Sequence, residues 1–302
     1  MGMRNLLFLL IIVLFVSCLP QAKNKHLTYQ NIAILSDLSD RIEPHINGTV
    51  PNQQYPQKDI EEIRKIIQFF KNECVKPGEK IGDKSSISFS PFSGNISAIV
   101  DVDQIKSLGD KQQFVNSTGK FRDNGLVEKL VEFEDAVISI YDNTKNKGLD
   151  LISILIEKIE SGDIVKKSTY LTNGLDTTFI NYDNHIYIFT DGYLEYWNAK
   201  TNRQFYFSED DINKVREYCI RNKVDIKTAL EREKSLALPT YIGEKNQYIN
   251  LHVFETHERD FNGKLNTYKN PKGLRDNEIL EAVWRKWAKE SRFKSFEWKK
   301  FR

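Results

Sequence analysis

Short apolar runs alternate with amphipathic segments along most of the chain. Runs rich in β-branched and aromatic residues predict strands, whereas apolar residues spaced three and four positions apart predict helices. The predicted strands cover residues 31–35, 86–92, 96–102, 185–190 and 250–255. The predicted helices cover residues 59–70, 125–141, 151–159, 210–221, 226–235 and 276–289.

The order of these elements indicates the fold class. The strands at 86–92 and 96–102 are separated only by a short turn, which predicts a hairpin-like pair. After this pair, strands and helices alternate, as in folds whose parallel strands are joined by crossover helices. We therefore predict an α/β fold, a Rossmann-like three-layer sandwich with a mainly parallel central sheet flanked by helices. No internal repeat interrupts residues 30–302, so we expect one domain there.

The N-terminal segment follows a different pattern. Arg4 precedes an unbroken apolar run from Leu6 to Val16. Such a run is short for a bilayer span and is typical of the core of a signal peptide. We expect residues 1–17 to form a signal peptide and residues 18–29 to form a polar tether.

The apolar run ends in Val16-Ser17-Cys18, which resembles the lipobox of bacterial lipoproteins. The resemblance implies that Cys18 is lipidated and becomes the mature N-terminus. It also implies a membrane-anchored lipoprotein of the cell envelope, at the outer membrane or on a periplasmic or extracellular face. The alternatives are a plain secretory signal and a signal anchor with an incidental cysteine.

The overall charge of the chain bears on its possible partners. The chain has 44 Lys and Arg against 42 Asp and Glu, a formal net charge of +2. Dedicated nucleic-acid binders usually show a strong basic excess, so we expect no nucleic-acid partner.

Apart from Cys18, the cysteines are Cys74 and Cys219. They could form one disulfide in an oxidising envelope or remain two buried free thiols.

Oxygen-bearing side chains follow two of the predicted strands. Asp37 and Ser39 come after the strand at 31–35, and Asp191 comes after the strand at 185–190. Ligands of parallel sheets bind at the carboxyl ends of the strands, and the spacing of two places Asp37 and Ser39 on the same side of the chain. Carboxylates and hydroxyls are ligands that suit Mg²⁺. We therefore predict that Asp37, Ser39 and Asp191 meet at this edge.

The same residues resemble a known family. Asp37-Leu38-Ser39-Asp40-Arg41 and Thr190-Asp191-Gly192 are similar to the D-x-S-x-S loop and the T-D-G-like turn of von Willebrand factor A-like domains. The similarity in element order extends over roughly residues 31–290. It implies a metal-ion-dependent adhesion site in which Asp37, Ser39 and Asp191 hold Mg²⁺, or Mn²⁺ or Ca²⁺. An acidic group of a partner would then complete the ligand shell.

Two positions depart from the family pattern. Arg41 stands where the loop has its second serine, and Leu149 stands where a distant threonine is expected. Both changes remove a hydroxyl ligand, and an inward-pointing arginine would repel a divalent cation. Asp40 and Asp150 could supply oxygens instead, or could cap the turns and helices that follow them. The site is therefore predicted to be degenerate.

These observations favour binding over catalysis. The chain has no G-x-S-x-G, G-x-x-x-x-G-K or H-E-x-x-H motif. His252 and His257 are five positions apart at a strand end, which favours packed or solvated histidines over a shared metal. We expect an envelope protein that engages a protein or envelope component at the carboxyl edge of the sheet. The alternative is a metal-dependent phosphatase or another hydrolase with Asp37 as nucleophile or ligand.

The C-terminal segment combines tryptophans with basic residues. Trp284 and Trp287 continue the helical spacing of Leu280 and Val283, so we expect them to pack against the sheet. Residues 285–302 contain eight basic residues interleaved with aromatic ones. We expect a basic aromatic C-terminal helix whose charged face is solvated, or lies on an anionic membrane or a partner.

Overall fold

The computed structural model describes residues 24–39, 56–78, 83–144, 148–174, 176–196, 204–255, 259–262 and 265–300. The predicted signal peptide, Cys18, Asp40, Arg41 and His257 lie outside these residues. The chain divides into two compact units. Among the described residues, one unit contains 24–28 and 167–182, and the other contains 29–166 and 183–300.

The strands form a mostly parallel sheet, in the order β3-β2-β1-β5-β6-β9. Their bounds are β1 (Asn24–Ser36), β2 (Ser86–Pro91), β3 (Ala98–Asp101), β5 (Thr177–Thr190), β6 (Ile249–Glu255) and β9 (Ser295–Lys300). Strand β1 pairs parallel with β2, and β6 pairs parallel with both β5 and β9. Strand β3 is antiparallel to β2, as predicted for the early pair. The predicted α/β class with a mainly parallel sheet is confirmed.

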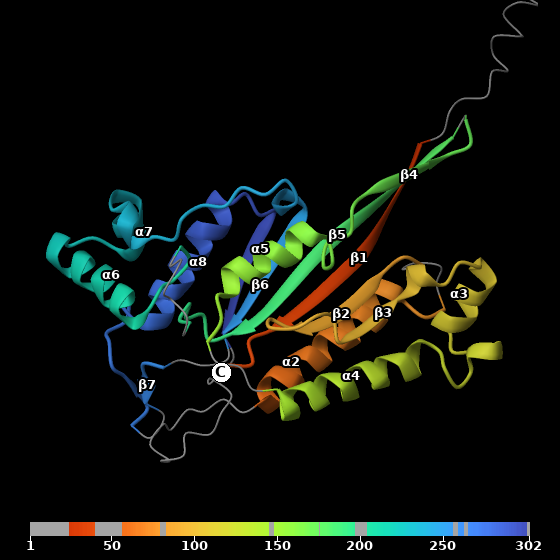
Figure 1. Cartoon of the computed structure of the whole chain (residues 1–302), viewed down its shortest axis with the longest axis horizontal. Coiled ribbons are helices and arrows are strands. Elements are labelled where there is room, and N and C mark those ends of the chain that lie inside the picture. Colours follow the sequence, from red (N-terminus) through yellow and green to blue (C-terminus); the bar gives the residue numbers. More distant parts are fainter. Residues whose placement is uncertain are drawn as a thin grey trace, which may run out of the picture. The chain divides into compact units, whose positions relative to one another are not determined.

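Helices cover both faces of this sheet in the larger unit (Figure 1). Ile32 and Ile34 of β1 belong to the core that contains α2 (Pro56–Phe69) and α4 (Leu126–Asn143). Ala33 and Leu35 point to the other core, because side chains alternate along a strand. That second core contains α5 (Leu151–Ser161), α6 (Glu209–Asn222), α7 (Ile226–Arg232) and α8 (Asp276–Glu290). No helix in the described ranges is long and apolar enough to cross a bilayer.

Two strands are longer than the apolar runs that predicted them. Strand β1 begins at Asn24, inside the stretch expected to be a tether, and β5 begins at Thr177 instead of residue 185. In the smaller unit, β5 pairs with β4 (Thr169–Thr172), and His26 stacks on Phe179 with ring centroids 4.7 Å apart. The side chains of β4 are exposed. Backbone pairing therefore defines these strand segments, and no apolar run marks them in the sequence.

The C-terminal segment corrects one prediction. Helix α8 ends at Glu290, and residues 295–300 form strand β9 instead of continuing a basic helix. Phe296 and Trp298 alternate with polar residues and pack against the core that contains α8, while β9 pairs with β6. The period of two is a strand pattern. As predicted, Trp284 and Trp287 of α8 are buried.

Both described cysteines are buried free thiols, so the disulfide alternative is wrong. Cys74 lies in the core on one face of the sheet and Cys219 in the core on the other. Because the sheet separates them, they cannot form a bond. Burial raises the pKa of the Cys74 thiol to about 12.

Candidate functional site

The predicted site residues lie where the topology of the sheet reverses. With β4 and the separate sheet of β7 (Phe261–Asn262) and β8 (Thr267–Tyr268) left aside, the strands follow the order 3-2-1-4-5-6 of doubly wound folds, whose switch point lies between β1 and β5. The backbone N–H of Asp37, directly after β1, donates to the carbonyl of Phe189 near the end of β5 at 2.8 Å. The carboxyl ends of the two strands therefore lie together. Loops diverge at such a point and leave a crevice for ligands.

Asp37 is held by both of these loops. Its side chain is buried, with 4% of the residue exposed. Oδ1 accepts a hydrogen bond from the backbone N–H of Ser39 at 3.2 Å. Oδ2 accepts one from the hydroxyl of Thr190, also at 3.2 Å. Thr190 thus connects the loop after β1 with the turn after β5.

The turn that follows β5 fixes Asp191. The backbone N–H of Gly192 donates to the Thr190 hydroxyl at 3.1 Å, and that of Tyr193 donates to Oδ1 of Asp191 at 3.2 Å. Gly192 has φ +84°, a conformation that few other residues adopt readily. A Cβ at Gly192 would lie 2.6 Å from Cη2 of Trp298. Position 192 therefore requires glycine, because of its backbone conformation and because Trp298 lies close to it.

Arg259, which the sequence analysis did not identify, pairs with Asp191. Its Nε and Nη2 lie 2.8 and 2.7 Å from Oδ2 of Asp191, and its Nη1 lies 2.7 Å from Oε2 of Glu195. The guanidinium carbon lies 3.8 Å from the centroid of the Tyr193 ring. Burial acts to lower the pKa of Arg259, but the carboxylates of Asp191 and Glu195 outweigh it and raise the pKa. The charge of Arg259 is therefore permanent.

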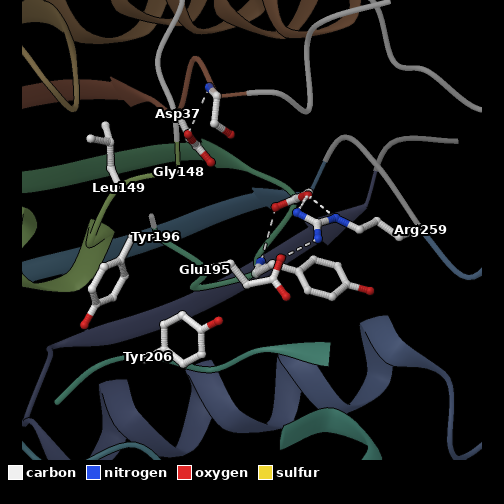
Figure 2. Close-up of a pocket in the computed structure, with 10 residues that line it drawn as sticks. Asp37, Gly148, Leu149, Glu195, Tyr196, Tyr206 and Arg259 are labelled. Carbon is white, nitrogen blue, oxygen red and sulfur yellow. Dashed lines mark hydrogen bonds and ion pairs between the residues drawn. The ribbon is translucent and has the colours of Figure 1, made fainter. Parts of the chain in front are cut away.

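These residues surround one open pocket of about 290 Å³, which is small among ligand-binding sites. In the view of Figure 2, Asp37 lies at upper left and Arg259 at right, with its guanidinium directed toward Glu195. The size suits a hydrated ion or a side chain of a partner. The lining residues are Asp37, Ser39, Gly148, Leu149, Asp191, Tyr193, Glu195, Tyr196, Tyr206 and Arg259.

The predicted ligand set thus meets at a single pocket. Asp37, Ser39 and Asp191 all line it, although they come from two loops that are far apart in the sequence. Leu149, which stands where the family pattern has a threonine, lines the same pocket and contributes only methyl groups. Asp150 caps α5 instead, because its Oδ1 accepts the N–H of Ser153 at 3.0 Å. The site is therefore assembled with one of its expected hydroxyls replaced by an aliphatic side chain.

The donor chemistry of the pocket suits a hard divalent ion, but Arg259 occupies part of the donor set. Two carboxylates and a hydroxyl are oxygen ligands of the kind that Mg²⁺ accepts. Oδ2 of Asp191 already accepts the Nε–H of Arg259 at 2.8 Å and forms an ion pair with its Nη2 at 2.7 Å. Within the described residues, no group of three or more His, Cys, Asp or Glu side chains has a geometry that could hold a metal. Asp191 would therefore have to release Arg259 before it joined a metal shell.

A second polar cluster lies on the sheet face that carries α2 and α4. Nδ1 of His185 lies 3.0 Å from Nε2 of His252. The outer nitrogens face carboxylates, with His185 Nε2 3.2 Å from Asp183 and His252 Nδ1 2.7 Å from Glu297. Carboxylates only accept, so the outer ring nitrogens are the donors in these two contacts. The contact between the two rings joins β5 to β6 through their side chains.

This arrangement predicts a pH-dependent stability. Burial lowers the pKa of His252 below its ordinary value of 6.5, and Glu297 opposes that shift. The unfolded chain therefore binds a proton more readily than folded His252, and the stabilisation is present above pH 6.5 and lost as the pH falls below it. We expect the free energy of unfolding, measured with urea, to decrease between pH 7.5 and pH 5.5. The decrease should be smaller in His252→Gln than in the wild type. His26→Gln removes an exposed histidine and should show the same decrease as the wild type. Equal slopes in all three proteins would contradict the assignment.

Comparisons with known proteins add no family to this picture. No protein-family model matches the chain, and a search of curated proteins found no match. The geometry of the pocket therefore carries the functional argument.

Proposed function

We propose that this chain is an exported, lipid-anchored envelope protein whose α/β domain resembles a von Willebrand factor A-like domain and binds a protein or envelope component. The binding site is the pocket at the carboxyl edge of the sheet. One observation carries the proposal, namely that Asp37, Ser39 and Asp191 line one pocket at the switch point between β1 and β5. The proposed anchor is the lipidated Cys18, on the basis of the lipobox-like sequence.

In this proposal Asp37, Ser39 and Asp191 hold Mg²⁺ or a similar divalent ion. When bound, the ion supplies an electrophilic position that an acidic group of a partner can occupy. Asp37 and Ser39 are positioned for this role by the first loop, and Asp191 by the turn at Gly192. Tyr196 and Tyr206 add aromatic surface to the pocket, which suits contact with a side chain of the partner.

A thermal melt of the full chain with and without Mg²⁺ tests the metal part of the proposal. At free Mg²⁺ of about 100 times Kd, binding adds about 2.7 kcal/mol to the stability of the folded state. For a chain of 302 residues, this raises Tm by about 4 °C. Asp37→Asn removes a ligand charge from the pocket, so we expect it to abolish the shift.

Asp150→Asn is the matched control, because asparagine still caps a helix and Asp150 is not among the pocket residues. It should keep the full shift. A chain that shows no shift with Mg²⁺ or Mn²⁺ has no metal at this edge. Hydrolysis of a generic phosphate ester by the wild type, lost in Asp37→Asn, would instead support the hydrolase alternative.

A further inference from the structure

We propose that Arg259 is an internal cation that competes with the divalent ion for Asp191. The pocket then holds either the guanidinium or the ion at this carboxylate, and not both. This inference rests on the proposed function, since it concerns how the metal site of that function is controlled.

The hydrogen bonds at Asp191 support mutual exclusion. A carboxylate oxygen has two acceptor positions. Nε of Arg259 donates to Oδ2 at 2.8 Å, and Nη2 lies 2.7 Å from the same oxygen in the ion pair, so the guanidinium crowds both positions. Oδ1 accepts the backbone N–H of Tyr193 at 3.2 Å, within the turn that shapes the site. A metal ligated by Oδ2 must therefore displace Arg259, whereas a metal ligated by Oδ1 would disturb the turn.

Electrostatic repulsion also opposes the simultaneous presence of the guanidinium and an ion at Asp191. An ion in the shell of Asp191 would lie within a few ångströms of the guanidinium, where two positive charges in a partly buried site repel strongly. The guanidinium is also held by Glu195 and by the face of Tyr193, an arrangement that attracts a cation. These contacts stabilise the pocket when no ion is bound. They reduce its apparent affinity for an ion.

Release of Arg259 requires little rearrangement of the core. Its side chain is 41% exposed, although the Asp191 side chain that it contacts is only 2% exposed. The guanidinium can therefore move toward solvent while Asp191 remains in place. Binding of an ion would free both Arg259 and Glu195 at the rim of the pocket, where a partner can contact them.

The test measures binding of Mn²⁺ to the full chain by the electron paramagnetic resonance signal of the free ion. Arg259→Gln removes the charge but keeps a side chain with hydrogen-bonding groups. We expect it to bind Mn²⁺ at least about tenfold more tightly than the wild type, because the competing cation is gone. Arg259→Lys keeps a positive charge and should bind like the wild type. Arg64→Gln is the matched control, since it removes one arginine from the ion pair with Glu134 on a different surface.

The outcomes separate this inference from the proposed function. If the wild type and Arg259→Gln bind Mn²⁺ with the same affinity, Arg259 is no competitor, and the metal site of the proposed function stands. If neither protein binds Mn²⁺, the metal site and the inference both fail. If Arg64→Gln gains affinity as well, the effect comes from net charge and not from Arg259, and the inference is overturned. Circular dichroism spectra that match the wild type confirm that each variant is folded.

Discussion

Trp284→Ala is expected to destabilise the protein by about 3–5 kcal/mol, the usual loss for a large aromatic side chain deleted from a core. Trp284 is 0% exposed and makes an edge-to-face contact with Trp287 at a centroid distance of 5.8 Å. Its indole Nε1 donates to the backbone carbonyl of Gly192 at 2.9 Å. The substitution therefore leaves a cavity and removes a support of the turn that carries Asp191. Urea denaturation, with the midpoint and slope fitted together, measures the loss.

Two further variants separate these contributions. Trp284→Phe keeps an aromatic ring but lacks the N–H, so we expect an intermediate loss. Tyr248→Ala deletes an aromatic side chain from a residue that is 57% exposed and should change stability by about 0.5 kcal/mol or less. A Trp284→Ala protein as stable as Tyr248→Ala would show that α8 does not pack on the sheet in the way described.

Gly192→Ala is expected to cost about 2–5 kcal/mol for two separate reasons. An alanine in the left-handed conformation costs about 1–2 kcal/mol, and overpacking costs about 1–3 kcal/mol more. Gly192 has φ +84°, and its new Cβ would lie 2.6 Å from Cη2 of Trp298. The Trp298 ring packs against the core, so it cannot move away freely. The variant should also bind Mg²⁺ more weakly, because the turn positions Asp191.

Gly273→Ala isolates the backbone contribution. Gly273 has φ +89°, and a Cβ there would meet no atom within 4 Å. We expect Gly273→Ala to lose only the free energy that an alanine costs in the left-handed conformation. Urea midpoints that fall equally in the two variants would mean that Trp298 does not press on Gly192. The close approach of β9, which carries Trp298, to the turn at Gly192 would then be wrong.

Much of the fold follows from local pattern. The predicted helices and buried strands lie within or beside the observed elements, because apolar periodicity reflects which face of an element is buried. Prediction and structure differ at the starts of β1 and β5 and at β9. At Asn24 there is no apolar run to read, and the segment is a strand because of its backbone pairing. At residues 295–300, Phe296 and Trp298 alternate with polar residues, which is the pattern of a strand. The basic and aromatic residues of 285–302 form a longer pattern over the same segment, and that pattern was interpreted as a helix.

The sequence by itself determined the type of fold and the two loops that carry Asp37, Ser39 and Asp191. These depend on residues close together in the chain, where spacing directly indicates strand ends and turns. Only the tertiary structure decided that Arg259 pairs with Asp191 and Glu195, which lie 68 and 64 positions away. It also placed His185 beside His252. Contacts of this kind depend on strand order and register, and an isolated arginine or histidine has no local pattern that reports its distant partner.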